Sequence, residues 1–172
     1  MYYKGIKMIP ESYSDIRLAL YKEGERILYV LGANPSTATD THSDHTMTKV
    51  IQFALKNNYD GFVMMNLYPL RSTNPRALPK VMDEELHKRN LAEIKELMSN
   101  SRNPVVLLAC GNAIGVAPYL KKCLKDIVTI LQPLCPQWKQ IGTPTKLGNP
   151  RHPSRAPYSL GFRDFDIKAF IR

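Results

Sequence analysis

The sequence has 172 residues, of which 44% are hydrophobic and 23% are charged, and its formal net charge is +9. This length suits a single domain over residues 1–172, and the composition excludes an intrinsically disordered chain. No apolar run reaches the length of a membrane-spanning helix, and the start of the chain lacks the apolar region of a signal peptide. We therefore expect a cytoplasmic protein with no membrane partner.

The positive charge is concentrated in the last third of the chain. After position 120 there are ten Lys or Arg residues against three Asp or Glu residues, so this part contributes +7. A one-sided basic excess is typical of proteins that bind polyanions, and we expect a nucleic acid or a nucleotide as the partner. The alternative is that the lysines and arginines serve solubility only.

The three cysteines, Cys110, Cys123 and Cys135, are odd in number and widely spaced. This spacing does not match a zinc ribbon or a cluster site, so we expect buried free thiols and no metal. The chain also lacks a Gly-x-Gly-x-x-Gly motif and a phosphate-loop lysine, and no cofactor is expected.

Apolar periodicity predicts the following elements in chain order. The run over 27–31 has no alternation, as in a strand buried on both faces, and 17–21 precedes it as the other half of an antiparallel hairpin. The rest of the chain predicts a helix over 47–57 capped by Thr46, a strand over 62–65, a helix over 83–98, a strand over 105–109, a helix over 113–122, a strand over 127–131 and an amphipathic segment over 164–171. This order indicates an α/β three-layer sandwich, with a central, mostly parallel four-stranded sheet and an N-terminal antiparallel hairpin.

An asparagine follows each of the first three long strands: Asn34, Asn66 and Asn112. Because ligands of open α/β sheets bind at the carboxyl ends of the strands, we expect these side chains to converge on one crevice. The alternatives are an Asx turn at Asn34 and a loop-bracing role for Asn66.

The segments Leu-Gly-Ala-Asn-Pro-Ser-Thr-Ala and Asn-Leu-Tyr-Pro-Leu-Arg-Ser-Thr-Asn-Pro, within residues 26–78, resemble DUF1643, a bacterial and phage family of unknown function. More distantly, the whole chain resembles the uracil-DNA glycosylase superfamily, whose motifs occur here in the same order. These are a strand followed by Gly-Ala-Asn-Pro at 32–35, a second strand ending in Asn66, a third ending in Gly-Asn at 111–112, and His-Pro-Ser at 152–154. This resemblance implies a uracil-DNA glycosylase-like fold.

The resemblance also implies catalytic roles for Asn34 and His152. Asn34 would hold the attacking water, and His152 would stabilise charge on the departing base. Asn66 would hydrogen-bond a flipped base along its Watson–Crick edge. The predicted base- or ligand-binding residues are Gly32, Pro35, Ser36, Asn66, Tyr68 and Asn112.

Such an enzyme also needs groups that grip phosphate or fill the gap left by the flipped base. The predicted phosphate- or nucleic-acid-binding residues are Arg71, Arg151, Ser154, Arg155 and Tyr158. For Arg71 a loop-bracing role is equally compatible with the sequence, and Arg151 and Arg155 are also compatible with ordinary surface charge.

The chain departs from the glycosylase pattern in three ways. An amide at Asn34 cannot act as a general base, so the reaction would depend on a positioned water and on a base that is a good leaving group. Ser36 stands where an aromatic residue usually forms a wall of the base pocket. His42, Asp44 and His45 add a group that can bind a metal or a phosphate, or that builds a different pocket rim.

The sequence therefore leaves three functional hypotheses. The first is an enzyme that hydrolyses the N-glycosidic bond of a modified base in DNA or of a free nucleotide. The second is a non-catalytic protein that binds a nucleotide or nucleic acid at the same strand ends, for example in phage–host conflict. The third is a nucleotide-binding enzyme with a doubly wound sheet, which the missing phosphate-binding motifs disfavour.

Overall fold

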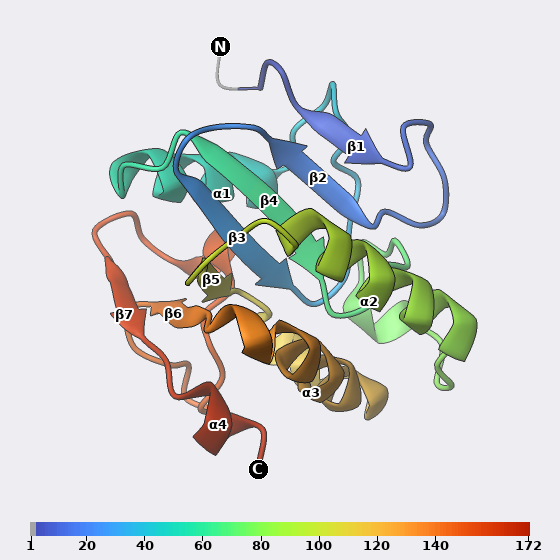
Figure 1. Ribbon diagram of the computed structural model, residues 1–172. Coiled ribbons are helices and arrows are strands. Elements are labelled where there is room, and N and C mark those ends of the chain that lie inside the picture. Colours follow the sequence, from blue (N-terminus) through green and yellow to red (C-terminus); the bar gives the residue numbers. More distant parts are fainter. Residues whose placement is uncertain (1–2) are drawn as a thin grey trace.

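The computed structural model describes residues 3–172 as a seven-stranded mixed sheet with helices on both faces (Figure 1). Residues 1 and 2, at the start that lacks a signal-peptide pattern, lie outside the described residues. The sheet order is β1-β2-β4-β3-β5-β6-β7. The strands are β1 (Lys7–Ile9), β2 (Ala19–Lys22), β3 (Ile27–Gly32), β4 (Gly61–Asn66), β5 (Val105–Leu108), β6 (Gln137–Ile141) and β7 (Phe162–Asp164).

The four central strands, in the order β4-β3-β5-β6, are parallel to one another, and antiparallel strands flank them on both sides. The mixed α/β class is confirmed, but the sheet has seven strands and not four. The hairpin predicted from 17–21 and 27–31 is wrong, because β4 lies between β2 and β3. Every residue of β4 is buried, and both of its edges are paired, with β2 on one side and β3 on the other.

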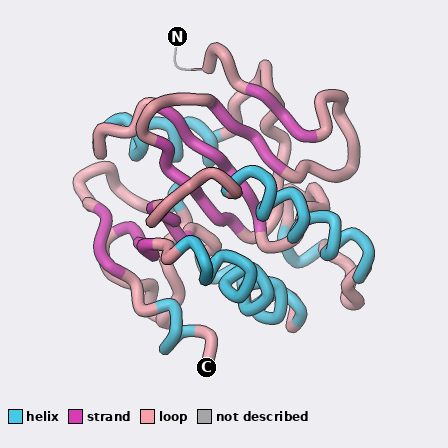
Figure 2. Tube along the Cα trace, in the orientation of Figure 1, coloured by secondary structure: helices cyan, strands magenta, loops and turns pink. Residues whose placement is uncertain are grey.

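The helices are α1 (His45–Lys56), α2 (Glu84–Met98), α3 (Tyr119–Leu131) and the short α4 (Ile167–Phe170), shown in cyan in Figure 2. Asp44 caps α1 by accepting a hydrogen bond from the backbone N–H of Met47 at 2.8 Å, so the cap predicted at Thr46 is wrong. Asp83 caps α2, which begins at Glu84, one residue after the predicted start. None of the helices in the described part is long and apolar enough to cross a membrane.

The predicted elements after β5 are misplaced. A 3₁₀ helix over Gly111–Gly115 replaces the first turns of the predicted helix, and the strand predicted over 127–131 is the end of α3. The buried positions Leu120, Leu124, Ile127 and Leu131 are spaced by four, three and four residues, which is the period of a helix. The fourth parallel strand is instead β6, whose mixed polar sequence carries a weaker strand signal.

The sheet separates two hydrophobic cores because alternate side chains of each strand point to opposite faces. From β3, Tyr29 and Leu31 pack on the face covered by α2 and α3, while Leu28 and Val30 pack on the face covered by α1. Figure 1 shows the same division, with α1 behind the sheet and α2 and α3 in front of it. The fold is thus a three-layer arrangement in which the carboxyl ends of β3, β4 and β5 lie side by side.

Candidate functional site

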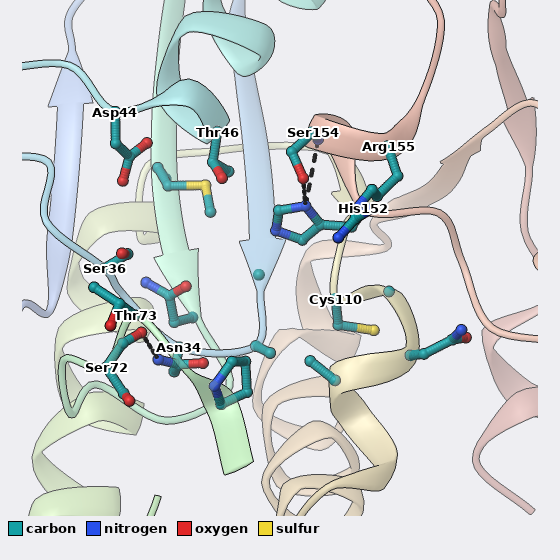
Figure 3. A pocket seen from close by; sticks show the side chains of 18 of the residues that line it. Asn34, Ser36, Asp44, Thr46, Ser72, Thr73, Cys110, His152, Ser154 and Arg155 are labelled. Atoms are coloured by element: carbon teal, nitrogen blue, oxygen red, sulfur yellow. Dashed lines mark hydrogen bonds between the residues drawn. The ribbon is translucent and has the colours of Figure 1, made fainter. Parts of the chain in front are cut away.

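A cleft of about 650 Å³ lies at the carboxyl ends of the parallel strands. Gly32 at the end of β3 is in register with Asn66 at the end of β4, and Leu31 is in register with Leu108 near the end of β5. The loop carrying His152 closes the opposite side (Figure 3). The structure therefore brings Asn34, Asn66, Asn112 and His152 together in one cleft.

The Asn66 side chain is 1% exposed, and neither its Nδ2 nor its Oδ1 has a hydrogen-bond partner within residues 3–172. We call this group the open amide. The Asn66 backbone is held in place, since Asn90 Nδ2 donates to its carbonyl at 2.9 Å. Gly32 leaves room for the amide, because a Cβ atom at position 32 would lie 2.8 Å from Asn66 Oδ1. A donor and an acceptor are thus held side by side on the cleft wall.

The Asn34 amide, in contrast, is oriented by two backbone carbonyls. Its Nδ2 donates to the carbonyl of Pro35 at 3.0 Å and to that of Ser72 at 2.9 Å, and Figure 3 shows the second bond. Both N–H groups of the amide are therefore occupied. Asn34 offers the cleft its Oδ1 alone, which can accept a hydrogen bond from a water or a ligand.

His152 is held by Ser154 in the short 3₁₀ helix Pro153–Arg155. The backbone N–H of Ser154 donates to His152 Nδ1 at 3.3 Å, and the Ser154 hydroxyl lies 2.7 Å from the same nitrogen. Burial lowers the pKa of His152, and the positive charge of Arg155 acts in the same direction. A neutral ring whose Nδ1 accepts carries its proton on Nε2, which leaves an N–H donor for the cleft.

Asn112 braces a neighbouring loop. Its Oδ1 accepts hydrogen bonds from Thr145 Oγ1 at 2.8 Å and from Asn149 Nδ2 at 3.0 Å. These bonds tie the loop over 145–149 to the end of β5. Asn112 lines the cleft, but its acceptor is already used.

The rim of the cleft is basic. Arg151 and Arg155 both line it, and Arg151 Nε donates to the carbonyl of Thr143 at 2.7 Å. Of the described residues that line the cleft, Asp44 is the single acid, and both of its carboxylate oxygens accept from backbone N–H groups, of Met47 at 2.8 Å and of Ala38 at 3.3 Å. A ligand in this cleft meets more positive than negative charge.

Gly32, Ser36 and Ser154 also line the cleft, whereas four predicted site residues do not: Pro35, Tyr68, Arg71 and Tyr158. Tyr68 is a core residue whose hydroxyl accepts from the backbone N–H of Asp83. Arg71 donates to the carbonyls of Ser14, Ser36 and Ala38, which corresponds to the loop-bracing alternative and not to a phosphate contact. Tyr158 packs on Phe53 of α1, with Lys49 Nζ 3.7 Å from its ring centroid. Pro35 contributes its carbonyl to the orientation of Asn34.

Arg17 is the main cleft residue that the sequence did not identify. It lines the cleft, yet its side chain is only 2% exposed. Arg17 comes directly before the apolar run that forms β2. An arginine next to a buried strand is uncommon, and this position was the one feature of the sequence that could have indicated a buried cleft residue. The expectation of three buried thiols also needs correction, since Cys110 and Cys123 are buried but Cys135 is exposed.

Of His42, Asp44 and His45, only Asp44 lines the cleft. Asp44 is used as the cap of α1, and His42 Nδ1 lies 2.9 Å from the hydroxyl of Thr41. Over residues 3–172 the structure contains no group of three or more His, Cys, Asp or Glu side chains that could hold a metal ion.

Comparison with protein families finds a match over most of the chain. The model of a family described as "Protein of unknown function (DUF1643)" matches residues 17–154. The match includes Arg17, the strand ends at Asn34 and Asn66, and His152, and it ends one residue before the cleft residue Arg155. No curated protein and no solved structure matches the chain significantly.

Proposed function

This chain belongs to the DUF1643 family, and we propose that it recognises a nucleobase in the cleft and hydrolyses the N-glycosidic bond of that base. The base belongs to DNA or to a free nucleotide. In this proposal the protein acts like a uracil-DNA glycosylase on a base that need not be uracil. The support for that likeness is the order of the four motifs: three lie at or just after the ends of β3, β4 and β5, and the fourth lies in the His152 loop that lines the same cleft.

The open amide is the observation that carries the proposal. A buried polar atom without a partner costs the folded protein about 1–3 kcal/mol, and a ligand that pairs with both amide atoms of Asn66 would remove that cost. The edges of nucleobases present a donor and an acceptor next to each other, and an asparagine amide can bind such a pair with two hydrogen bonds. Asn66 therefore has the chemistry of a base-reading residue.

Asn34 and His152 supply the complementary groups for bond cleavage. The Asn34 Oδ1 accepts a hydrogen bond from a water molecule. This bond orients the water so that the water oxygen points at C1′ of the sugar. As the bond from this oxygen to C1′ forms, the C1′–N bond breaks and its electron pair leaves with the base. His152 Nε2–H donates to the base and stabilises this developing charge, and a proton from the water ultimately goes to the departing base.

The cleft favours a base that leaves readily. Asn34 cannot accept a proton, and the carboxylate of Asp44 is engaged by the start of α1. Without a dedicated general base, the rate depends on positioning and on the stability of the leaving group. We therefore expect a modified or damaged base to be cleaved faster than an ordinary one.

The test is base release by the purified protein from a panel of modified DNA duplexes, single strands and free nucleotides, followed by chromatography. We expect one substrate class to release a free base, and Asn34→Ala and His152→Ala to abolish release while binding persists. Asn112→Ala serves as the matched control, because it removes a strand-end amide that braces a loop. Absence of a released base across the panel would contradict the hydrolase part of the proposal.

A second candidate is a non-catalytic protein that binds a nucleotide or nucleic acid in the same cleft, for example in phage–host conflict. The engaged carboxylate of Asp44 and the amide of Asn34 favour it, since neither is a free base. This candidate predicts salt-sensitive binding without turnover, weakened by charge reversal at Lys121, Arg151 or Arg155. Unchanged affinity in all three variants would remove it.

A further inference from the structure

Arg17 lies just before β2, at the same end of the sheet as the open amide. Its backbone N–H donates to the carbonyl of Pro69 at 2.9 Å, which holds it against the loop that follows β4. The side chain lines the cleft although only 2% of it is exposed. A charged group is thus held deep in the cleft and not at its rim.

The Arg17 guanidinium is incompletely satisfied. Its Nη1 donates to the carbonyl of Ala38 at 3.0 Å, while its Nε is buried and has no hydrogen-bond partner in the part of the chain that the structure describes. No carboxylate of residues 3–172 lies within salt-bridge distance of it. A buried charge with no carboxylate paired to it among residues 3–172 is unfavourable, and a bound anion would lower that cost.

The surroundings of Arg17 carry an excess of positive charge. Arg71 donates to the same Ala38 carbonyl at 3.0 Å, so two guanidiniums converge on one oxygen. The nearby carboxylate of Asp44 is engaged by backbone N–H groups. Burial and the charge of Arg71 lower the pKa of Arg17 to about 10, so the guanidinium is still protonated at neutral pH. One negative charge therefore faces two positive ones.

We infer that Arg17 binds the phosphate group of a small ligand whose base is read by Asn66, and that the ligand is a nucleoside monophosphate. This inference rests on the proposed function, because it takes base recognition by the open amide as given. A guanidinium binds phosphate oxygens in a planar, two-pronged geometry, and a phosphate would supply the missing counter-charge. The phosphates of a polymer run along a surface, whereas a terminal phosphate monoester can enter the cleft and reach a side chain that is 2% exposed.

The test compares each nucleoside with its own 5′-monophosphate by isothermal titration calorimetry, using uridine, cytidine, adenosine, guanosine and inosine. For whichever of these bases the wild-type protein binds, we expect the monophosphate to bind roughly 10- to 100-fold more tightly than the nucleoside. In Arg17→Gln this ratio should fall to within about twofold of one, with the affinity for the nucleoside retained. Equal affinities in the wild type, or a ratio that survives in Arg17→Gln, would overturn the inference.

Lys49→Met is the matched control. Lys49 is another buried cation, but it lies outside the cleft lining, and its Nζ donates to the carbonyl of Ala156 at 2.6 Å. The substitution removes the same unit of charge, so the ratio should stay at its wild-type value. If the affinity ratio of monophosphate to nucleoside also falls close to one in Lys49→Met, the phosphate responds only to the net charge of the protein. In that case the assignment to Arg17 is wrong.

A measurement on the wild type covers the case in which Arg17→Gln does not fold. Inorganic phosphate should compete with the monophosphate and should not compete with the nucleoside. Competition with neither ligand would contradict a phosphate site in the cleft.

The two proposals fail in different ways. If the nucleoside and the monophosphate bind equally well and both depend on Asn66, the phosphate site is wrong and base recognition stands. If the monophosphate binds through Arg17 but is indifferent to Asn66→Leu, base recognition is wrong. If neither ligand binds while a modified DNA still releases its base, the monophosphate inference is wrong and base recognition stands.

Discussion

The two ends of the parallel strands are built differently. At the amino end, the Asp60 carboxylate accepts from the backbone N–H groups of Arg26 at 2.7 Å and Glu25 at 3.1 Å. These backbone bonds lower the pKa of Asp60. Gly24 and Gly61 approach so closely that a Cβ atom at position 61 would lie 2.8 Å from Gly24 N. This end is closed, with its polar groups paired and its backbones in contact.

The carboxyl end of the same strands holds a cleft of about 650 Å³, the open amide and the buried guanidinium of Arg17. Both ends belong to one continuous sheet, so the difference does not arise from poor packing of the fold as a whole. It separates polar groups that are paired within the protein from polar groups that have no partner among residues 3–172.

The largest expected effect is that of Asn66→Leu, which keeps the branching of the side chain at Cγ and removes the open amide. Affinity for the base should fall by about 2–4 kcal/mol, or roughly 30- to 1000-fold in Kd, because two hydrogen bonds are lost. The free energy of unfolding of the unliganded protein should rise by about 1 kcal/mol, since unpaired buried atoms disappear. Titration calorimetry and urea unfolding measure the two effects.

Asn90→Leu is the control for this pair of effects. Asn90 is also buried, but its Nδ2 donates to the carbonyls of Asn66 and Leu67, so its loss should lower stability. If Asn66→Leu destabilises the protein as Asn90→Leu does and leaves base affinity unchanged, Asn66 is a structural residue and the contrast between the two ends is lost.

At the closed end, Gly61→Ala should lower the free energy of unfolding by about 1–3 kcal/mol, because the new methyl group meets backbone atoms that cannot move aside. Affinity for the base should not change. Urea unfolding and calorimetry on the same variant check this, and a loss of affinity would mean that the two ends are not independent.

Gly32→Ala makes the matching change at the cleft. The new Cβ would lie 2.7 Å from Met64 Cε and 2.8 Å from Asn66 Oδ1, which are side-chain atoms that can shift. We expect a loss of base affinity of about tenfold, as the open amide is displaced, with a smaller change in stability than in Gly61→Ala. Equal destabilisation by the two variants would show that the cleft wall is as rigid as the closed end.

The strands that form the cleft were predictable because each is a continuous apolar run that ends in a polar residue. The runs over 27–31 and 62–65 lie within β3 and β4, and the run over 105–109 contains β5. The strand order was not predictable in the same way. Nothing in the local pattern of β2 and β3 indicates that β4 lies between them, because pairing is decided by tertiary packing.

The meeting of Asn34, Asn66 and His152 followed from topology, since parallel strands end at one edge of a sheet. The topology did not predict which of these side chains are hydrogen-bonded within the protein and which are not. The Asn34 N–H groups donate to two carbonyls, whereas the Asn66 amide has no partner among residues 3–172, although both residues lie at the end of a buried strand. The motif around Arg71 predicts a phosphate contact, but the Arg71 side chain braces loops. Arg17 belongs to an ordinary strand pattern, but its side chain lines the cleft. These roles depend on contacts between segments far apart in the sequence.

The pH dependence of stability should report on His152. Burial lowers its pKa in the folded state, whereas the unfolded chain has the ordinary value of about 6.5. Between these values the unfolded state binds a proton that the folded state does not, so stability falls as pH falls below about 6.5. We expect a smaller loss of stability in His152→Gln than in the wild type between about pH 7 and about pH 5. Parallel profiles would mean that the ring is not held neutral.

The smallest effect concerns the thiols at the two ends. Cys110 lines the cleft end, and burial raises its pKa to about 12, whereas Cys135 precedes β6 at the other end and is exposed. Titration of the native protein with a thiol reagent should modify Cys135 and spare Cys110, because the thiolate is the reactive form. Modification of Cys110 at a comparable rate would show that solvent penetrates the floor of the cleft.

The most direct measurement is a crystal structure of the protein soaked with free nucleobases and with the nucleoside monophosphate that binds best. The account predicts a base in the cleft, with its edge hydrogen-bonded to both amide atoms of Asn66 and its ring between Asn34 and His152. A base bound elsewhere, or a cleft in which Asn66 makes no contact with it, would contradict the account.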